Sequence, residues 1–152
     1  MAAQLIHVVR HAHAGDPAAW SANGDLRPLS ERGCGQADRL VAEIQGPALV
    51  VSSPSLRCLA TVLPLAHAHR LPLSTLWELY EGGKGAAMLA SLVRLGASPL
   101  VACSHGDVIL DLLATLDRHG VTLPSASAAK GSTWTLEVRD GRVSSARYAP
   151  PP

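Results

Sequence analysis

Arg10 and His11 stand together at the end of a short apolar run, residues 5–9. Such a run predicts a buried β-strand, and the carboxyl ends of strands are where open α/β sheets bind their ligands. An imidazole at that place can act as a nucleophile, a base or a metal ligand. The guanidinium beside it favours a phosphate-containing substrate, because its fork of N–H donors matches phosphate oxygens. The pair therefore predicts a ligand-binding position and leaves the chemistry open.

Two later strand ends carry polar side chains in the same way. Residues 48–51 form an apolar run that Arg57 follows, about one turn into a predicted helix. Residues 99–103 form another, and His105 comes after it. Because the carboxyl ends of parallel strands lie at one edge of a sheet, these side chains should meet the first pair in one cleft. Two guanidiniums and two imidazoles together indicate an anion, to which each charge-assisted hydrogen bond contributes roughly 1.5–3 kcal/mol.

The rest of the pattern supplies the elements that must position this edge. Its order is β-α-β-α-β-α-β-α, and an Asp-Gly pair at 140–141 then marks a hairpin. The expected strands are residues 5–9, 48–51, 71–76, 99–103, 133–138 and 142–148, and the expected helices lie at about 30–45, 55–69, 85–95 and 108–119. Pro64 should kink the second helix or end it early. This order predicts an α/β fold, a three-layer sandwich with a mostly parallel sheet, helices on both faces and a C-terminal hairpin strand pair.

Length and composition bound the class of protein. The chain has 152 residues, a formal net charge of +1, three cysteines and no phenylalanine. Residues 1–148 are expected to form a single domain, followed by a frayed proline tail at 149–152. Scattered basic residues and few aromatic side chains argue against a nucleic acid polymer as partner. The odd cysteine count, and the lack of a signal peptide pattern or a membrane-spanning run, predict a cytoplasmic protein with no membrane partner.

Four short segments follow one another in a familiar order. They are Arg-His-Ala at 10–12, Ser-Pro-Ser-Leu-Arg at 53–57, Leu-Trp-Glu at 76–78 and Ser-His-Gly at 104–106. Together they resemble the motifs of the histidine phosphatase superfamily, and the short chain is similar to its smallest branch, the SixA-type phosphohistidine phosphatases. The segment Lys-Gly-Ser-Thr-Trp at 130–134 resembles the histidine phosphatase domain that is fused to some bacterial Nudix hydrolases. The resemblance covers nearly the whole chain.

This resemblance implies a role for each residue of the cluster. His11 would attack phosphorus and carry the phosphoryl group. Arg10, Arg57 and His105 would bind the phosphoryl oxygens, and Glu78 would protonate the leaving oxygen and then activate water. No metal and no other cofactor is implied, because fixed cations can neutralise the charge that metal ions neutralise in other phosphatases. The attacking imidazole must be neutral, so its second nitrogen should donate to a backbone carbonyl or a similar acceptor.

Three side chains have less certain roles. Glu81 lies three residues after Glu78 and is the other candidate for the general acid. His13 is expected at the rim of the pocket, where it could contact the substrate. Lys130 could reach a phosphate from a long loop. For each of them, the alternative is an ordinary solvated side chain.

The predicted function is that of a metal-independent, SixA-type phosphatase that acts on a phosphohistidine of a protein through phospho-His11. The gaps between the motifs are too short for an inserted lid, which favours an open site and a protruding substrate. The alternative is a phosphatase of nucleotides or other small phosphate esters, suggested by the Nudix-associated tail. Two other classes are a metal-dependent hydrolase at His11, His13 and Asp16, and a non-catalytic phosphate-binding domain. The expected partner is thus a phosphorylated protein or a small phosphate ester.

Overall fold

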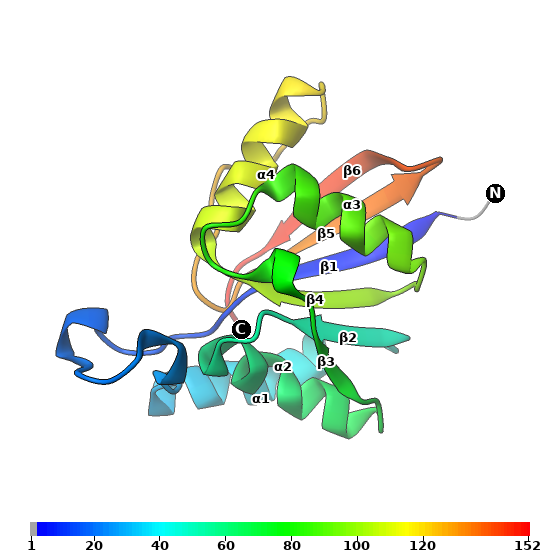
Figure 1. Cartoon of the computed structure of the whole chain (residues 1–152). Coiled ribbons are helices and arrows are strands. Elements are labelled where there is room, and N and C mark those ends of the chain that lie inside the picture. Colours follow the sequence, from blue (N-terminus) through cyan, green and yellow to red (C-terminus); the bar gives the residue numbers. More distant parts are fainter. Residues whose placement is uncertain (1–2) are drawn as a thin grey trace.

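A six-stranded sheet forms the centre of the molecule, as Figure 1 shows for the computed structural model of the chain. The structure describes residues 3–152. The strands are β1 (Gln4–Arg10), β2 (Leu49–Ser52), β3 (Leu73–Thr75), β4 (Leu100–Ser104), β5 (Thr133–Arg139) and β6 (Arg142–Ala149). The helices are α1 (Glu31–Glu43), α2 (Leu56–Ala68), α3 (Gly85–Leu95) and α4 (Gly106–Arg118), with short 3-10 helices η1 (Pro17–Ala19), η2 (Gly24–Leu26) and η3 (Trp77–Leu79).

The strand order, β3-β2-β4-β1-β5-β6, brings the polar strand ends to one edge. β4 lies between β1 and β2 and is parallel to both, and β3 is parallel to β2. In register, Arg10 lies opposite Ser104, and Ser52 lies opposite Cys103. β5 is antiparallel to β1 and forms the predicted hairpin with β6. The mostly parallel sheet and the C-terminal strand pair are therefore confirmed.

Helices cover both faces of the sheet and complete the three layers. α1 and α2 lie on one face, and α3 and α4 lie on the other (Figure 1). Successive side chains of a strand point to opposite faces, so Val8 packs in the core beneath α3 and α4, while Val9 packs in the core beneath α1 and α2. Each fully buried side chain of this kind contributes about 1.5–3 kcal/mol. This packing holds the strand ends in a fixed arrangement.

The helices follow the sequence pattern with one correction. Ser30 caps α1, because its Oγ accepts a hydrogen bond from the backbone N–H of Gly33 at 3.1 Å. The early stop offered for Pro64 is wrong, since α2 continues to Ala68. Val62 and Leu65, on either side of the proline, are fully buried, and this packing offsets the loss of one helical hydrogen bond. Within residues 3–152, no helix is both long and apolar enough to cross a membrane.

The C-terminal tail differs from the frayed segment predicted for residues 149–152. Ala149 belongs to β6 and pairs with Thr133. Pro152 is half-buried and lines a small cavity together with His7 and Leu40. The reason is that the hairpin is one residue longer than the sequence pattern indicated, which carries the apolar proline rings onto the side of the domain.

Candidate active site

Four side chains that the sequence placed at separate strand ends come together at one edge of the sheet. The rings of His11 and His105 have centroids 5.6 Å apart, in an edge-to-face arrangement. Arg57 approaches the same histidine, with Nη2 3.3 Å from Nδ1 of His105. The backbone N–H of His11 donates to the carbonyl of Ser104 at 3.0 Å, which ties β1 to the turn that carries His105. The predicted convergence is thus observed.

His11 is held in a defined orientation. Its side chain is buried, and Nδ1 lies 2.9 Å from the carbonyl oxygen of Ala12. A carbonyl only accepts, so Nδ1 carries the proton and Nε2 keeps its lone pair. Burial lowers the pKa of His11 to about 3; the bond to Ala12 opposes this shift, and the cation of Arg57 adds to it. A neutral imidazole with a free Nε2 is the form that can attack phosphorus.

His11 will therefore stay neutral across the physiological pH range. The burial that lowers its pKa from 6.5 to about 3 means that the folded protein takes up this proton only near pH 3. Two-bond ¹H–¹⁵N spectra of the imidazole should show the Nδ1–H tautomer without titration between about pH 5 and 8. The spectrum of a His11→Asn variant assigns the signal. Titration of that signal within this range would contradict the assigned environment.

Arg10 points into the same cluster with one donor unused. Its Nη1 donates to the carbonyl of Ala128 at 2.6 Å, while its Nε is buried and has no hydrogen-bond partner. Gly106 makes room for this guanidinium, because a Cβ there would lie 2.7 Å from Arg10 Cζ. Burial lowers the pKa of Arg10, and the charge of Asp107 opposes that shift. The close approach of the Arg10 guanidinium thus explains why a residue without a Cβ follows His105.

Arg57 is the second guanidinium with an unused donor. Its Nη1 donates to the carbonyl of Gly24 at 3.0 Å, and its Nη2 lies 3.3 Å from a carboxylate oxygen of Glu81. Its Nε, like that of Arg10, is buried without a partner. Leaving a buried donor unsatisfied costs about 1–3 kcal/mol, so two such groups in one cluster indicate a place for an acceptor-rich ligand. A phosphoryl group has the oxygens to fill it.

The third unsatisfied side-chain atom in the described residues belongs to the same neighbourhood. It is Oγ of Ser132, and the carbonyl of this serine accepts from the backbone N–H of Arg10 at 3.0 Å. Gly131, one residue earlier, donates its N–H to the carbonyls of Arg10 and His11, both at 3.1 Å. Lys130, predicted to bind the substrate, is therefore next to the cluster in the chain, and its side chain is half-buried.

His105 is oriented by residues that the sequence did not single out for this task. Its Nε2 lies 2.8 Å from Oγ of Ser53, and its ring meets the edge of Tyr80 with centroids 6.0 Å apart. The hydroxyl of Tyr80 donates to Asp25 at 2.7 Å, a bond that lowers the pKa of Asp25. Ser53 stands in the second motif and could have been found. Asp25 lies in the short 3-10 helix η2 and gave no sequence signal.

The two candidate acids occupy different places. Glu81 contacts Arg57 and is 58% exposed. Glu78 lies in η3 and is exposed, and its carboxylate has no ion pair or hydrogen bond with the cluster. The next residue, Leu79, is fixed to the site because its carbonyl accepts from the Ser104 hydroxyl at 2.7 Å. The contacts thus place Glu81 against Arg57 and show no contact between Glu78 and the cluster.

His13 does not point its Nδ1 toward the cluster. That nitrogen lies 2.6 Å from Oγ of Ser30, the N-cap of α1. Asp16, the third residue of the metal alternative, uses Oδ1 to accept from the backbone N–H of Ala18 at 2.9 Å. Across residues 3–152, no three His, Cys, Asp or Glu side chains gather in a way that could hold a metal ion. The hydrogen bonds of His13 and Asp16 therefore stabilise the loop that follows β1.

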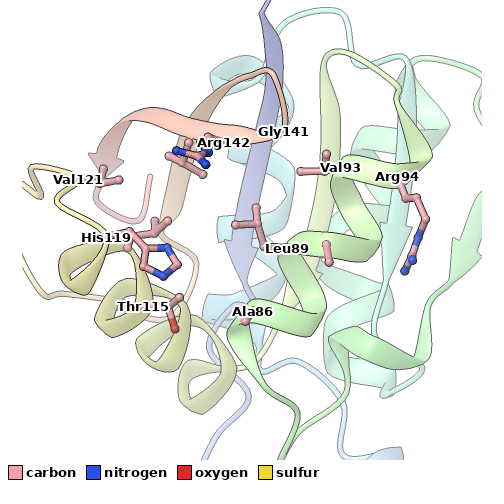
Figure 2. A pocket seen from close by; sticks show the side chains of 12 residues that line it. Ala86, Leu89, Val93, Arg94, Thr115, His119, Val121, Gly141 and Arg142 are labelled. Carbon is pink, nitrogen blue, oxygen red and sulfur yellow. The ribbon is translucent and has the colours of Figure 1, made fainter.

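A large cavity lies away from this cluster. It has a volume of about 790 Å³ and opens between α3, α4 and the β5–β6 hairpin (Figure 2). Leu89, His119 and Gly141 are among its lining residues. His119 follows the last residue of α4, whereas the first, Gly106, adjoins His105, so the cavity and the cluster lie at opposite ends of that helix. The volume of a cavity therefore does not identify the site that carries the candidate catalytic side chains.

Comparisons with known proteins agree with the motifs. Residues 6–88 match the sequence profile of the histidine phosphatase superfamily (branch 1). The chain is 34% identical over 159 residues to an 8-oxo-(d)GTP phosphatase of Mycolicibacterium smegmatis. The alignment covers 98% of this chain and 49% of that protein. The chain thus spans about half the length of the curated relative it matches.

Solved structures share the fold at lower identity. The phosphohistidine phosphatase SixA of Agrobacterium tumefaciens superposes with a TM-score of 0.70 at 21% identity, over 97% of this chain and 98% of that one. An α-ribazole-5′-P phosphatase of Escherichia coli superposes with a TM-score of 0.71 at 15% identity, over 97% and 95%. These likenesses confirm the predicted architecture. With the sequence match over more than half of its length, the chain belongs to branch 1 of the histidine phosphatase superfamily, and the prediction of a phosphatase is confirmed at the level of the family.

Proposed function

We propose that this domain removes a terminal phosphoryl group through a covalent phosphohistidine at His11. One observation carries the proposal: a buried, neutral imidazole, with Nδ1 bonded to the Ala12 carbonyl, lies among guanidinium donors that have no partner. The donors of Arg10 and Arg57 supply positive charge where charge develops on the phosphoryl oxygens. These fixed cations take the place of a metal ion in the proposed reaction.

The proposed reaction has two steps. In the first, the lone pair of His11 Nε2 forms a bond to phosphorus, the bond from phosphorus to the leaving oxygen breaks, and Glu78 gives that oxygen a proton. In the second, water attacks phosphorus, Glu78 takes the proton, and the bond between nitrogen and phosphorus breaks, which restores neutral His11. The Nδ1–H bond to Ala12 persists throughout and stabilises the positive charge on the phosphorylated ring.

Glu78→Gln is expected to slow the hydrolysis of an alkyl phosphate about 10²-fold, because an alkoxide is a poor leaving group and needs the proton. The same variant should be phosphorylated by p-nitrophenyl phosphate nearly as fast as the parent protein, since p-nitrophenolate departs unaided, whereas hydrolysis of phospho-His11 should slow equally for both substrates. Rapid-quench rates of phosphoenzyme formation with each substrate measure the contrast. Glu81→Gln is the matched variant; a contrast that appears there and not in Glu78→Gln would transfer the acid role to Glu81.

For the substrate, we propose a nucleoside di- or triphosphate. The relative at 34% identity carries the name of an 8-oxo-(d)GTP phosphatase, and the likeness extends over nearly all of this chain. A phosphohistidine of a protein, the substrate class expected from the sequence, is the second candidate. The structures of that class share 21% identity with this chain and support the fold.

Phosphate release in the presence and absence of EDTA tests the proposed reaction. The panel comprises p-nitrophenyl phosphate, GTP, GDP, 8-oxo-dGTP and a phosphohistidine protein. We expect turnover that EDTA does not change, together with an acid-labile, base-stable phosphoenzyme. Loss of activity in EDTA would favour the metal-dependent class. Phosphate binding without turnover of any substrate would favour the binding domain and overturn the proposal.

A further inference from the structure

Trp77 presents a large aromatic surface to solvent at one edge of the sheet. The same edge carries the side chains of Arg10, His11, Arg57 and His105, which together form the proposed phosphate cradle. It is 70% exposed, although it stacks on Tyr80 with ring centroids 4.7 Å apart and planes inclined by 9°. Tyr80 covers one face of the indole, so the exposure leaves the opposite face open. Exposed aromatic rings that lie parallel to a second ring are ready to take a third planar group.

This stacked pair is fixed in place before any ligand binds. The Tyr80 hydroxyl donates to Asp25 Oδ2 at 2.7 Å, and Oδ1 of the same carboxylate accepts from the Ser55 hydroxyl at 3.0 Å. In the chain segment between Trp77 and Tyr80, the carbonyl of Leu79 accepts a hydrogen bond from the Ser104 hydroxyl at 2.7 Å. Little conformational freedom then remains to be lost when a ligand stacks, which favours binding.

The pair is also directly joined to the cradle. The edge of the Tyr80 ring meets His105, with centroids 6.0 Å apart, so a single ring separates Trp77 from a proposed phosphate ligand. Glu81, the residue after Tyr80, contacts Arg57. A molecule with a planar ring at one end and a phosphate chain at the other has the matching shape.

A second exposed apolar residue lies next to Asp25 in the chain. Leu26 follows it in the chain, belongs to η2 and is 58% exposed. The carbonyl of Gly24, also in η2, accepts from Arg57. Exposed apolar residues occur singly on most proteins and need no explanation there. Here two of them, Leu26 and Trp77, lie on chain segments that both contact Arg57. This shared contact marks the surface beside the cradle as a binding surface.

We infer that the open face of Trp77 stacks against the nucleobase of a nucleoside phosphate whose terminal phosphoryl group lies on Arg57 and His105. The inference rests on the proposed function and extends it by assigning the base to a specific surface. Stacking accepts any base, since every base has a π face. The platform thus contributes affinity for nucleosides as a class, while the cradle selects the phosphate.

Binding to a catalytically inactive protein tests the platform without turnover. In a His11→Ala background, the affinity for GTP and for tripolyphosphate, which has no base, is measured by calorimetry. Trp77→Ala should weaken GTP binding about 5- to 150-fold, the range expected for one stacked base, and should leave tripolyphosphate binding unchanged. Trp77→Phe should retain most of the GTP affinity. Leu63→Ala, at another exposed apolar residue, on α2, should change neither.

The outcomes separate the platform from the proposed reaction. Equal loss for GTP and tripolyphosphate would show that Trp77 only supports the cradle, and unchanged GTP affinity would show that no base stacks there; either overturns the inference while phospho-His11 turnover stands. A Trp77→Ala defect confined to a phosphohistidine protein would overturn it in favour of a protein substrate. If the unmodified domain forms no phosphoenzyme, the proposed function fails, whatever the platform binds.

Discussion

His11→Ala will lower kcat for every substrate of the domain by at least about 10³-fold, and no phosphoenzyme will form. The variant removes the proposed nucleophile, and His105 cannot replace it, because its Nε2 lies 2.8 Å from Ser53 Oγ and its Nδ1 lies 3.3 Å from Arg57 Nη2. Water would have to attack without a covalent intermediate. Single-turnover kinetics and acid quenching with a ³²P-labelled substrate measure the two effects.

The control for this variant is His119→Ala, which removes an exposed imidazole after the last residue of α4. It should leave kcat unchanged. The His11→Ala protein should still bind inorganic phosphate, because the guanidinium donors of Arg10 and Arg57 remain in place. Retained turnover above about one hundredth of the parent rate would remove His11 from the nucleophile role.

The sequence predicted this cluster well because the apolar strands pair in parallel, so that side chains at their carboxyl ends lie side by side. Arg10, Arg57 and His105 each follow an apolar strand, and parallel pairing of those strands leaves their ends at one edge. The neutral state of His11 was also predicted, since a nucleophile needs an acceptor for its other nitrogen, and the Ala12 carbonyl supplies it. Such inferences depend on backbone periodicity and on simple donor and acceptor rules.

The supporting residues could not be predicted in the same way. Asp25 lies in η2, a three-residue helix too short to show periodicity, and its bond to Tyr80 spans 55 residues of sequence. Glu81, ranked second from its spacing, contacts Arg57 of α2 from the turn that follows η3. Contacts of this kind depend on loop conformation, which local propensity does not determine. The same holds for the tail, where one extra pair, Thr133 with Ala149, replaced the expected fraying.

Arg57→Lys should reduce kcat/KM about 10²- to 10⁴-fold, nearly as much as Arg57→Ala, although the charge is kept. Arg57 Nη1 donates to the Gly24 carbonyl at 3.0 Å, while Nη2 lies 3.3 Å from Nδ1 of His105 in the proposed phosphate site. A lysine ammonium is a point charge and cannot serve both directions from one planar fork. Loss of two charge-assisted bonds, at about 1.5–3 kcal/mol each, gives the stated range. Arg39→Lys, on the exposed side of α1, is the matched control and should be neutral. Steady-state kinetics decide the matter: if Arg57→Lys keeps full activity while Arg57→Ala loses it, charge alone is what the cradle requires at this position.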